Sequence, residues 1–214
     1  MRRAALVPVL ACALTLSGSE AISSPQKSPV PQSELRNISS GDVDTAFGKL
    51  QTYWRRQGVG AVSTRLAFLQ GKQTVTCNLA NKQVTINADQ IALEYCPTSN
   101  TIIVSELGFK VLNFFAGEDI KPEPLAELVI GHEYGHGVQE AKKENLTRVK
   151  LELEADCYSG EALAGINSPA IQDAATFYGI IGRVPGTDHG TPMQRYLSFE
   201  EGALFDTCDS LPGS

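Results

Sequence analysis

The sequence contains little positive charge and no basic cluster. Its 18 lysines and arginines are outnumbered by 24 aspartates and glutamates, which gives a formal net charge of −6. Basic residues adjoin one another only in short pairs such as Arg55-Arg56 and Lys142-Lys143. Because a surface that binds nucleic acid must neutralise phosphates with clustered positive charge, we expect no nucleic-acid partner.

Aromatic residues are also scarce, at 7% of the chain, although 42% of the residues are hydrophobic. A chain of 214 residues with this composition is long enough to bury one sizeable core. We therefore expect a single domain whose core is filled mainly by aliphatic side chains and alanine.

Long apolar runs are missing except near the N-terminus. Arg2-Arg3 precede an apolar run over residues 4–16, and the small residues of Ser19-Glu20-Ala21 follow. This order is typical of a secretory signal peptide, and the run is short for a membrane span. We expect cleavage after Ala21 and a secreted or cell-envelope protein with no stable membrane span. An uncleaved anchor and lipidation at Cys12 are the alternatives.

The composition changes twice along the chain. Residues 22–41 are rich in Ser, Pro, Gln and Asn and predict a flexible linker, so we place the domain at 42–214. A helical pattern begins at Asp42 and ends near Gly58, and β-branched residues between 74 and 104 predict three or four short strands. The remainder is expected to be helical. The predicted fold class is α+β, mainly α, with a small antiparallel sheet.

No pair of cysteines has the C-x-x-C spacing of a structural zinc site. With Cys12 removed in the signal peptide, an even number of cysteines remains, which in an exported chain indicates two disulfides with three possible pairings. We favour Cys77–Cys96, which brackets the strand-rich segment, and Cys157–Cys208, which ties the C-terminal tail to a helix. Buried free thiols are the alternative.

The chain has only three histidines, and two of them lie four residues apart in His132-Glu133-Tyr134-Gly135-His136. On a helix this spacing places both imidazoles on one face, where they can ligate one Zn²⁺. Glu133 is then positioned to act as general base toward a water that the metal activates. Because the preceding Leu128-Val129-Ile130 is apolar, the helix is expected to be buried, where unpartnered polar side chains are costly. An ordinary helix with incidental histidines is the alternative.

A third ligand is predicted from the register of the next helix. If the two helices form an antiparallel hairpin that turns near Glu144, residues at equal distance from the turn face each other. His136 and Glu152 each lie eight residues from Glu144, and His132 and Asp156 each lie twelve. We therefore predict Glu152 as the third zinc ligand and Asp156 as the carboxylate that holds the free N–H of a ligand histidine.

These motifs resemble those of a bacterial family of neutral zinc metallopeptidases. The matching residues are His132-Glu133-x-x-His136 followed by Glu152-x-x-Ala155-Asp156-Cys157, with Cys96-Pro97 and Asn100-Thr101 before them and Asp188-His189-Gly190-Thr191-Pro192 with Gln194-Arg195 after them. The resemblance covers roughly residues 42–208. It implies a gluzincin-like peptidase with a zincin-like fold, in which the glutamate that opens Glu-x-x-Ala-Asp ligates zinc.

The sequence departs from this family at two positions. Gly137 stands where many relatives have a histidine, and Glu154 stands where many have glutamine. Neither position is a predicted ligand. Glu154 is rotated about 200° from Glu152 on a helix, so we expect its carboxylate to be solvated on the surface.

His189 is the third histidine and lies in a glycine-rich loop. We consider two roles for it, stabilising the oxyanion that forms during peptide hydrolysis or capping the loop. Arg195 is expected to form a structural salt bridge. Tyr158 and Tyr178 are alternative oxyanion donors, although we expect both to pack in the core.

The expected function is that of a secreted zinc metallopeptidase that acts on a peptide or protein substrate. Residues 101–104 are a candidate edge strand along which an extended substrate could pair. Two alternatives stay open. One is a non-catalytic, zinc-stabilised module for binding or assembly at the cell envelope, and the other is a zinc amide hydrolase that acts on cell-wall material.

Overall fold

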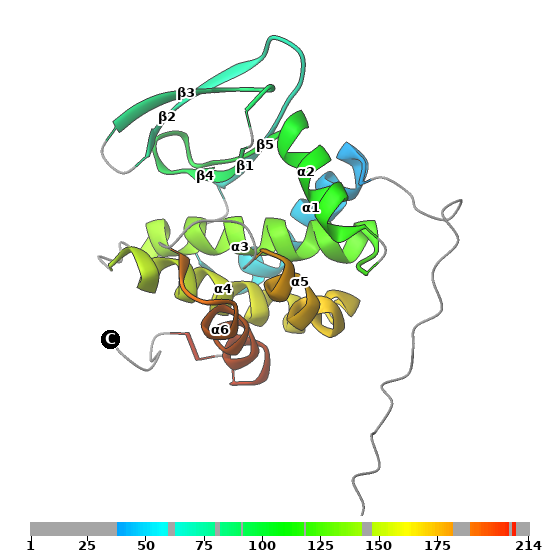
Figure 1. The fold of residues 1–214 in the computed structure, drawn as a ribbon. Coiled ribbons are helices and arrows are strands. Elements are labelled where there is room, and N and C mark those ends of the chain that lie inside the picture. The colour runs from blue at the N-terminus through cyan, green and yellow to red at the C-terminus, as the bar shows by residue number, and fades with distance from the viewer. Residues whose placement is uncertain are drawn as a thin grey trace, which may run out of the picture.

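A computed structural model describes residues 38–59, 63–79, 82–90, 92–117, 119–142, 147–181, 189–205 and 207–208 (Figure 1). The expected signal peptide and nearly all of the expected linker lie outside these ranges. So do Glu144, at the expected turn of the helical hairpin, and Asp188 in the glycine-rich loop.

The described part of the chain is mainly helical, with a smaller share of strand, which confirms the α+β class. The elements occur in the order α1 (Ser40–Arg56), β1 (Arg65–Leu69), β2 (Thr74–Leu79), β3 (Lys82–Asn87), β4 (Leu93–Cys96), η3 (Pro97–Ser99), β5 (Thr101–Ser105), α2 (Glu106–Ala116), α3 (Pro122–Lys142), α4 (Arg148–Gly165), η4 (Pro169–Asp173), α5 (Ala174–Ile181) and α6 (Pro192–Phe205).

The first helix begins slightly earlier than the apolar pattern indicates. Ser39 is its N-cap and accepts from the backbone N–H of Asp42, while the Asp42 carboxylate accepts from the backbone N–H of Ser39. This capping box satisfies backbone donors that have no partner inside the helix. Asp42 therefore lies in the first turn of α1 and does not mark its beginning.

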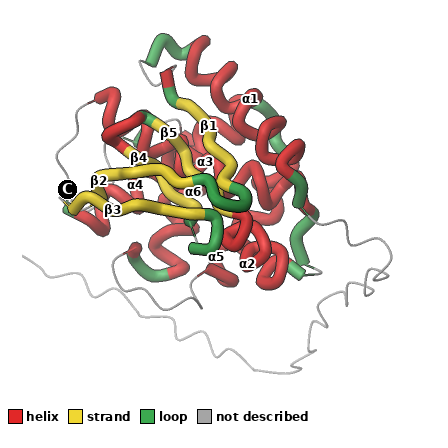
Figure 2. The backbone as a smooth tube through the Cα atoms, turned by 90° about the horizontal axis from the view of Figure 1, so that it is seen from above, coloured by secondary structure: helices red, strands yellow, loops and turns green. Residues whose placement is uncertain are grey.

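The strands form two small sheets, seen from above in Figure 2. One has the order β1-β5-β4, with β1 parallel and β4 antiparallel to β5, and the other is the antiparallel hairpin β2-β3. Strand β1 was not expected from the sequence. The expectation that residues 101–104 form an edge was wrong, because β5 is the central strand and all its residues are buried. An uninterrupted apolar run of this kind is typical of a strand covered on both faces.

The helices lie in layers below the three-stranded sheet (Figure 1). Helix α3 contacts β4 and β5 on one side and packs along α4 on the other, and α4 in turn packs along α6. Helix α1 contacts both α3 and α4. The main core lies between these layers, and a smaller apolar cluster that includes Leu69, Ile86 and Ile103 lies between the sheet and the hairpin.

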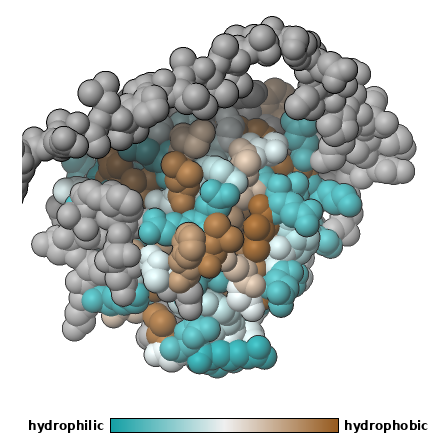
Figure 3. Space-filling model, turned by 90° about the horizontal axis from the view of Figure 1, so that it is seen from below, coloured by the Kyte–Doolittle hydropathy of each residue, from teal (hydrophilic) through white to brown (hydrophobic). Residues whose placement is uncertain are grey.

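The outer side of α6 has exposed apolar side chains. Met193, Leu197, Leu204 and Phe205 each have more than half of their surface exposed. Apolar atoms also gather on the face of the molecule seen from below in Figure 3, the side on which α6 lies. The opposite side of α6 packs on α4.

Both disulfides that we favoured are present, Cys77–Cys96 and Cys157–Cys208. The first joins the hairpin to the end of β4, and the second joins α4 to the segment that follows α6. No helix in the described residues is both long and apolar enough to cross a bilayer.

Glycines allow the stacked helices to approach closely. A Cβ added at Gly135 of α3 would lie 2.5 Å from the carbonyl oxygen of Ala155 in α4. A Cβ at Gly202 of α6 would collide with the carbonyl oxygen of Cys157 in α4. Both contacts are with backbone, so they cannot be relieved by rotating a side chain, and any larger residue must push the helices apart.

We predict that Gly135→Ala destabilises the domain by about 1–3 kcal/mol, the usual cost of overpacking. Gly48→Ala is the matched control, because Gly48 lies inside α1 and an added Cβ there meets nothing within 4 Å. It should be neutral or stabilising, since alanine favours helix. Urea denaturation of both variants measures the effect, and equal stability of the two would contradict the close-approach interpretation.

Candidate metal centre

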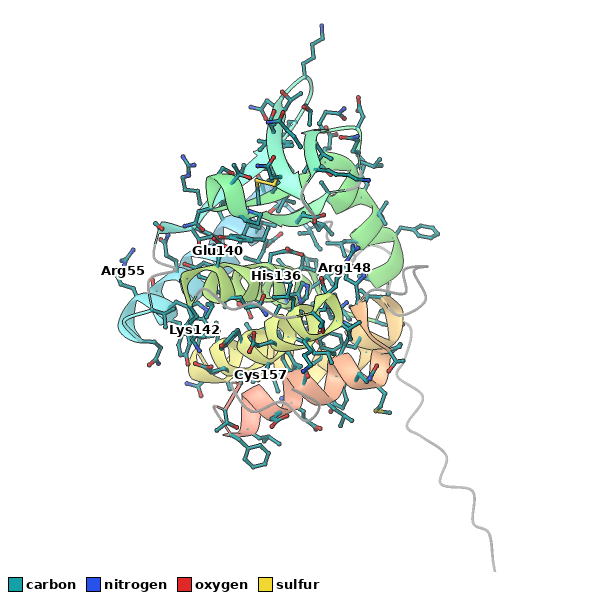
Figure 4. The ribbon with its side chains drawn as sticks, turned by 90° about the vertical axis from the view of Figure 1, so that its left-hand side faces the viewer. Arg55, His136, Glu140, Lys142, Arg148 and Cys157 are labelled. Carbon is teal, nitrogen blue, oxygen red and sulfur yellow. A yellow bond between two sulfur atoms is a disulfide. The ribbon has the colours of Figure 1, made fainter. Side chains whose placement is uncertain are left out.

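Helices α3 and α4 bring three potential metal ligands together. One ligand atom from each of His132, His136 and Glu152 lies within 4.8 Å of the others. Glu152 Oε2 is 3.3 Å from His132 Nε2 and 3.8 Å from His136 Nε2. Figure 4 shows the side chains of this helix pair, with His136 labelled on α3 and Cys157 on α4. The antiparallel register predicted from the sequence therefore places Glu152 beside both histidines.

The donor atoms of this group suit a metal ion. Glu152 Oε2 is buried and forms no hydrogen bond of good geometry with the described residues, although His132 Nε2 lies 3.3 Å away. A buried carboxylate oxygen without a partner is costly, and a cation held jointly with two imidazole nitrogens would satisfy it. His132, His136 and Glu152 can thus bind a metal ion together.

The electrostatics of the group favour a cation. Burial raises the pKa of Glu152, but His132, together with His136 and His189, outweighs burial and lowers this pKa to about 2. Burial, followed by the charge of His132, lowers the pKa of His136 to about 4. At neutral pH the group therefore offers an ionised carboxylate and a neutral imidazole, which are the forms that bind metal.

Asp156 holds the first histidine from the side of α4. Its Oδ1 lies 2.8 Å from His132 Nδ1, so Nε2 of the same ring is left to point at Glu152. Arg195 of α6 donates to both oxygens of Asp156, from Nε at 2.7 Å and from Nη2 at 2.9 Å. The salt bridge expected for Arg195 is therefore formed with Asp156.

Tyr178 of α5 also takes part in this network. Its hydroxyl donates to Asp156 Oδ1 at 3.0 Å, and its side chain is buried in the main core, as expected from the sequence. Burial raises the pKa of Asp156, but Arg195 and His132 outweigh burial and hold it below its usual value. Asp156 therefore remains ionised and keeps His132 oriented.

The second histidine is held by residues that the sequence analysis missed. His136 Nδ1 lies 2.9 Å from Gln139 Oε1, and the amide nitrogen of Gln139 donates to Leu151 O and Glu154 Oε2. Gln139 is three residues after His136 on the same helix face, a spacing that could have identified it.

The expectation that Glu154 is solvated was wrong. Only 7% of this residue is exposed, and its carboxylate accepts a hydrogen bond from Gln139. The helical rotation correctly turned Glu154 away from Glu152. The helical pattern did not reveal that α4 is covered by α3 on one side and by α6 on another. The side of α4 that carries Glu154 is therefore buried as well.

Glu133 lies between the ligand group and the sheet. It is 7% exposed and accepts a hydrogen bond from the backbone of Tyr95 in β4. Burial raises the pKa of Glu133 to about 8, and the carboxylates of Glu94 and Glu152 also raise it, whereas the charge of His132 opposes them. A bound dication would lower this pKa, because it is the largest local charge in such a site.

His189 is also brought to the group. Its Nε2 lies 3.8 Å from Glu152 Oε2, and its side chain is 46% exposed. It precedes α6, which carries Arg195, so one segment places His189 at the open side of the group and Arg195 at the buried side. All three histidines of the chain therefore lie around Glu152.

We predict that metal affinity rises with pH. Burial lowers the pKa of His132, but Asp156 outweighs burial and raises it to about 10, so the metal-free protein holds a proton that a metal must displace. Below pH 10 the affinity should increase by at least about tenfold per pH unit, because at least one proton is released. Chelator competition between pH 6 and 9 measures this slope.

The variant Asp156→Asn serves as the comparison for this prediction. Without the Asp156 carboxylate, the pKa of His132 loses the largest contribution that raises it, so the increase of metal affinity with pH should become less steep. A slope that is unchanged in this variant would contradict the role given to Asp156.

Comparisons with known proteins found no relative whose site could be compared with this one. Neither a protein-family model, nor a curated protein, nor a solved structure matches the chain. The resemblance described above is thus carried by the motifs alone, and the candidate function depends on the group formed by His132, His136 and Glu152.

Proposed function

We propose that this chain is a zinc-dependent peptidase in which Glu133 is the general base. The observation that carries the proposal is the position of Glu133, which follows the first ligand on α3 and is buried between the ligand group and β4. A site that only binds metal has no need of this carboxylate. Burying an ionisable group without a chemical role is costly, which favours catalysis over a purely structural metal site.

Zinc is the metal that we propose. Two histidines and one carboxylate are a common zinc donor set, and three protein ligands leave a position open for water, as in catalytic sites. When bound, the ion lowers the pKa of a water toward about 7 and polarises the carbonyl of a substrate.

The residues of the chain supply the proton transfers and the orientation. Glu133 takes a proton from the attacking water and delivers it to the leaving nitrogen. The hydrogen bond from the Tyr95 backbone fixes one side of this carboxylate. Asp156 and Gln139 fix the two histidines through their Nδ1 atoms, so that both Nε2 atoms converge on Glu152.

A peptide substrate is proposed to lie along β4. This strand is an edge of its sheet, it contacts α3, and Tyr95 within it contacts Glu133. An extended peptide that pairs with β4 would have its backbone beside the general base. Strand β4 thus replaces residues 101–104 as the candidate substrate strand.

We also propose that the protein is exported. The two disulfides are typical of proteins from oxidising compartments, whereas cytosolic thiols are kept reduced. Peptides or proteins outside the cytoplasm are then the substrates, and cross-linking peptides of the cell wall belong to the same class of amide bonds.

The variant Glu133→Gln tests the proposal. We expect it to bind one zinc per chain, as the wild type does, and to lose about 10²–10⁴-fold in kcat because the general base is gone. Metal analysis and digestion of a peptide library that includes cell-wall peptides give the two readouts. The control is Glu106→Gln on α2, whose carboxylate pairs only with Lys110 among the described residues.

Two results would oppose the proposal. If Glu133→Gln keeps full activity in the peptide assay, Glu133 is not the general base. A wild-type protein that binds stoichiometric zinc but cleaves no peptide would favour the metal-stabilised binding module.

We predict that His189→Ala lowers kcat by about 10²–10³-fold, as expected for loss of an oxyanion donor. Zinc content should be retained, because His189 does not belong to the group of three ligands. Parallel measurement of kcat, KM and zinc separates the two roles considered for this residue. If His189 only caps its loop, then kcat will stay within about twofold of the wild type and the unfolding midpoint will fall instead.

A further inference from the structure

Glu94 occupies an unusual position on the edge strand β4. Its backbone pairs with Ile103 of β5, and β4 has no partner on its other side among the described strands. Tyr95 and Cys96, the next two residues, are buried, whereas Glu94 is exposed. A carboxylate is therefore presented to solvent at the edge along which we place the substrate.

This carboxylate is close to the metal group. The adjacent Tyr95 donates its backbone hydrogen bond to Glu133, which places this part of β4 over the site. Glu94 is near enough to Glu152 and Glu133 for their charges to interact directly. Glu94 is the charged residue of β4, so a substrate that pairs with this strand would meet its charge.

The other carboxylates of the site have compensating charges. Asp156 is neutralised by Arg195, and a divalent ion would offset Glu152 together with Glu133. The side-chain carboxylate of Glu94 forms no hydrogen bond or ion pair within the described part of the chain. Burial, followed by the charge of Glu152, raises the pKa of Glu94, while Arg148 at the beginning of α4 opposes this shift to a smaller extent. The charge of Glu94 is therefore left for a ligand to balance.

We propose that Glu94 makes the site selective for substrates with a basic side chain, lysine or arginine, next to the cleaved bond. The inference rests on the proposed function and on the placement of the peptide along β4. A substrate cation at this position gains attraction from Glu94, whose carboxylate gives up no hydrogen-bond or ion-pair partner among the described residues. An acidic side chain there meets a carboxylate of like charge, which disfavours binding.

The test uses peptides in which one lysine is moved through the positions that flank the cleaved bond. Each peptide is paired with an otherwise identical one that carries acetyl-lysine, which keeps the length and removes the charge. In the wild type, kcat/KM should favour lysine over acetyl-lysine at one flanking position. Glu94→Gln should reduce this ratio by about fivefold, the effect of one partly exposed ion pair. Glu94→Lys should invert the ratio, and Glu106→Gln should leave it unchanged.

A binding measurement separates this inference from the peptidase activity. The zinc-loaded Glu133→Gln protein is titrated with the same labelled peptides, with and without Glu94→Gln, and fluorescence anisotropy is recorded. One outcome is that the wild type cleaves no peptide, while lysine peptides still bind the Glu133→Gln protein in a manner that depends on Glu94. In that case the selectivity stands and the peptidase proposal fails. If the wild type cleaves peptides and the ratio is equal in all the Glu94 variants, the selectivity is overturned and the peptidase proposal stands.

Discussion

The Asp156 carboxylate is the contact on which the site depends most. It lies on α4 and receives hydrogen bonds from Arg195 of α6 and Tyr178 of α5, and it holds His132 of α3. It is completely buried, and a buried carboxylate is tolerated only when it is fully paired. Removing Arg195 would leave the charge of Asp156 uncompensated in the core, and removing Tyr178 would take away one of its hydrogen bonds. The candidate metal ligand His132 is therefore held in place by the packing of four helices and not by a local turn.

The close packing of the helices follows from this requirement. Arg195 can reach Asp156 only if α6 lies almost in contact with α4, and Gly202 allows this distance beside the backbone of Cys157. Cys157 is the residue after Asp156, and its disulfide with Cys208 fixes the end of α6 to the same point. Two adjacent residues of α4 thus combine three features. Asp156 is the carboxylate that holds His132, and Cys157 forms the disulfide and is approached by Gly202. Breaking the disulfide would loosen the helix that supplies Arg195.

Much of this site could be predicted from the sequence, because the spacing of its residues along two neighbouring helices determines which side chains face one another. The spacing of His132 and His136 predicts a shared helix face, and the distances of Glu152 and Asp156 from the turn predict their partners. The environment of Glu154 was predicted wrongly and Gln139 was missed, because their environment depends on which helices cover α4 and α3. Whether β5 is central or at an edge is likewise decided by β1, whose pairing is non-local and parallel to a strand more than thirty residues later. Periodicity specifies which way a side chain points, but only packing specifies what lies there.

The sheet and the helical hairpin must also be held in a fixed relation, since Glu133 belongs to one and the proposed substrate strand to the other. Tyr95 provides the direct link, because its side chain packs in the main core while its backbone contacts Glu133. At the next residue, Cys96 belongs to the second apolar cluster and is bonded to Cys77 of the hairpin β2-β3. Strand β4 is therefore held from both faces, by α3 below and by the hairpin above, while no described strand pairs with its outer edge. An open edge on an otherwise fixed strand suits a surface that aligns a substrate backbone, since little order must be gained when a peptide binds. Glu94 lies on that fixed strand, so its charge occupies a defined place relative to Glu133, as selectivity for one substrate position requires.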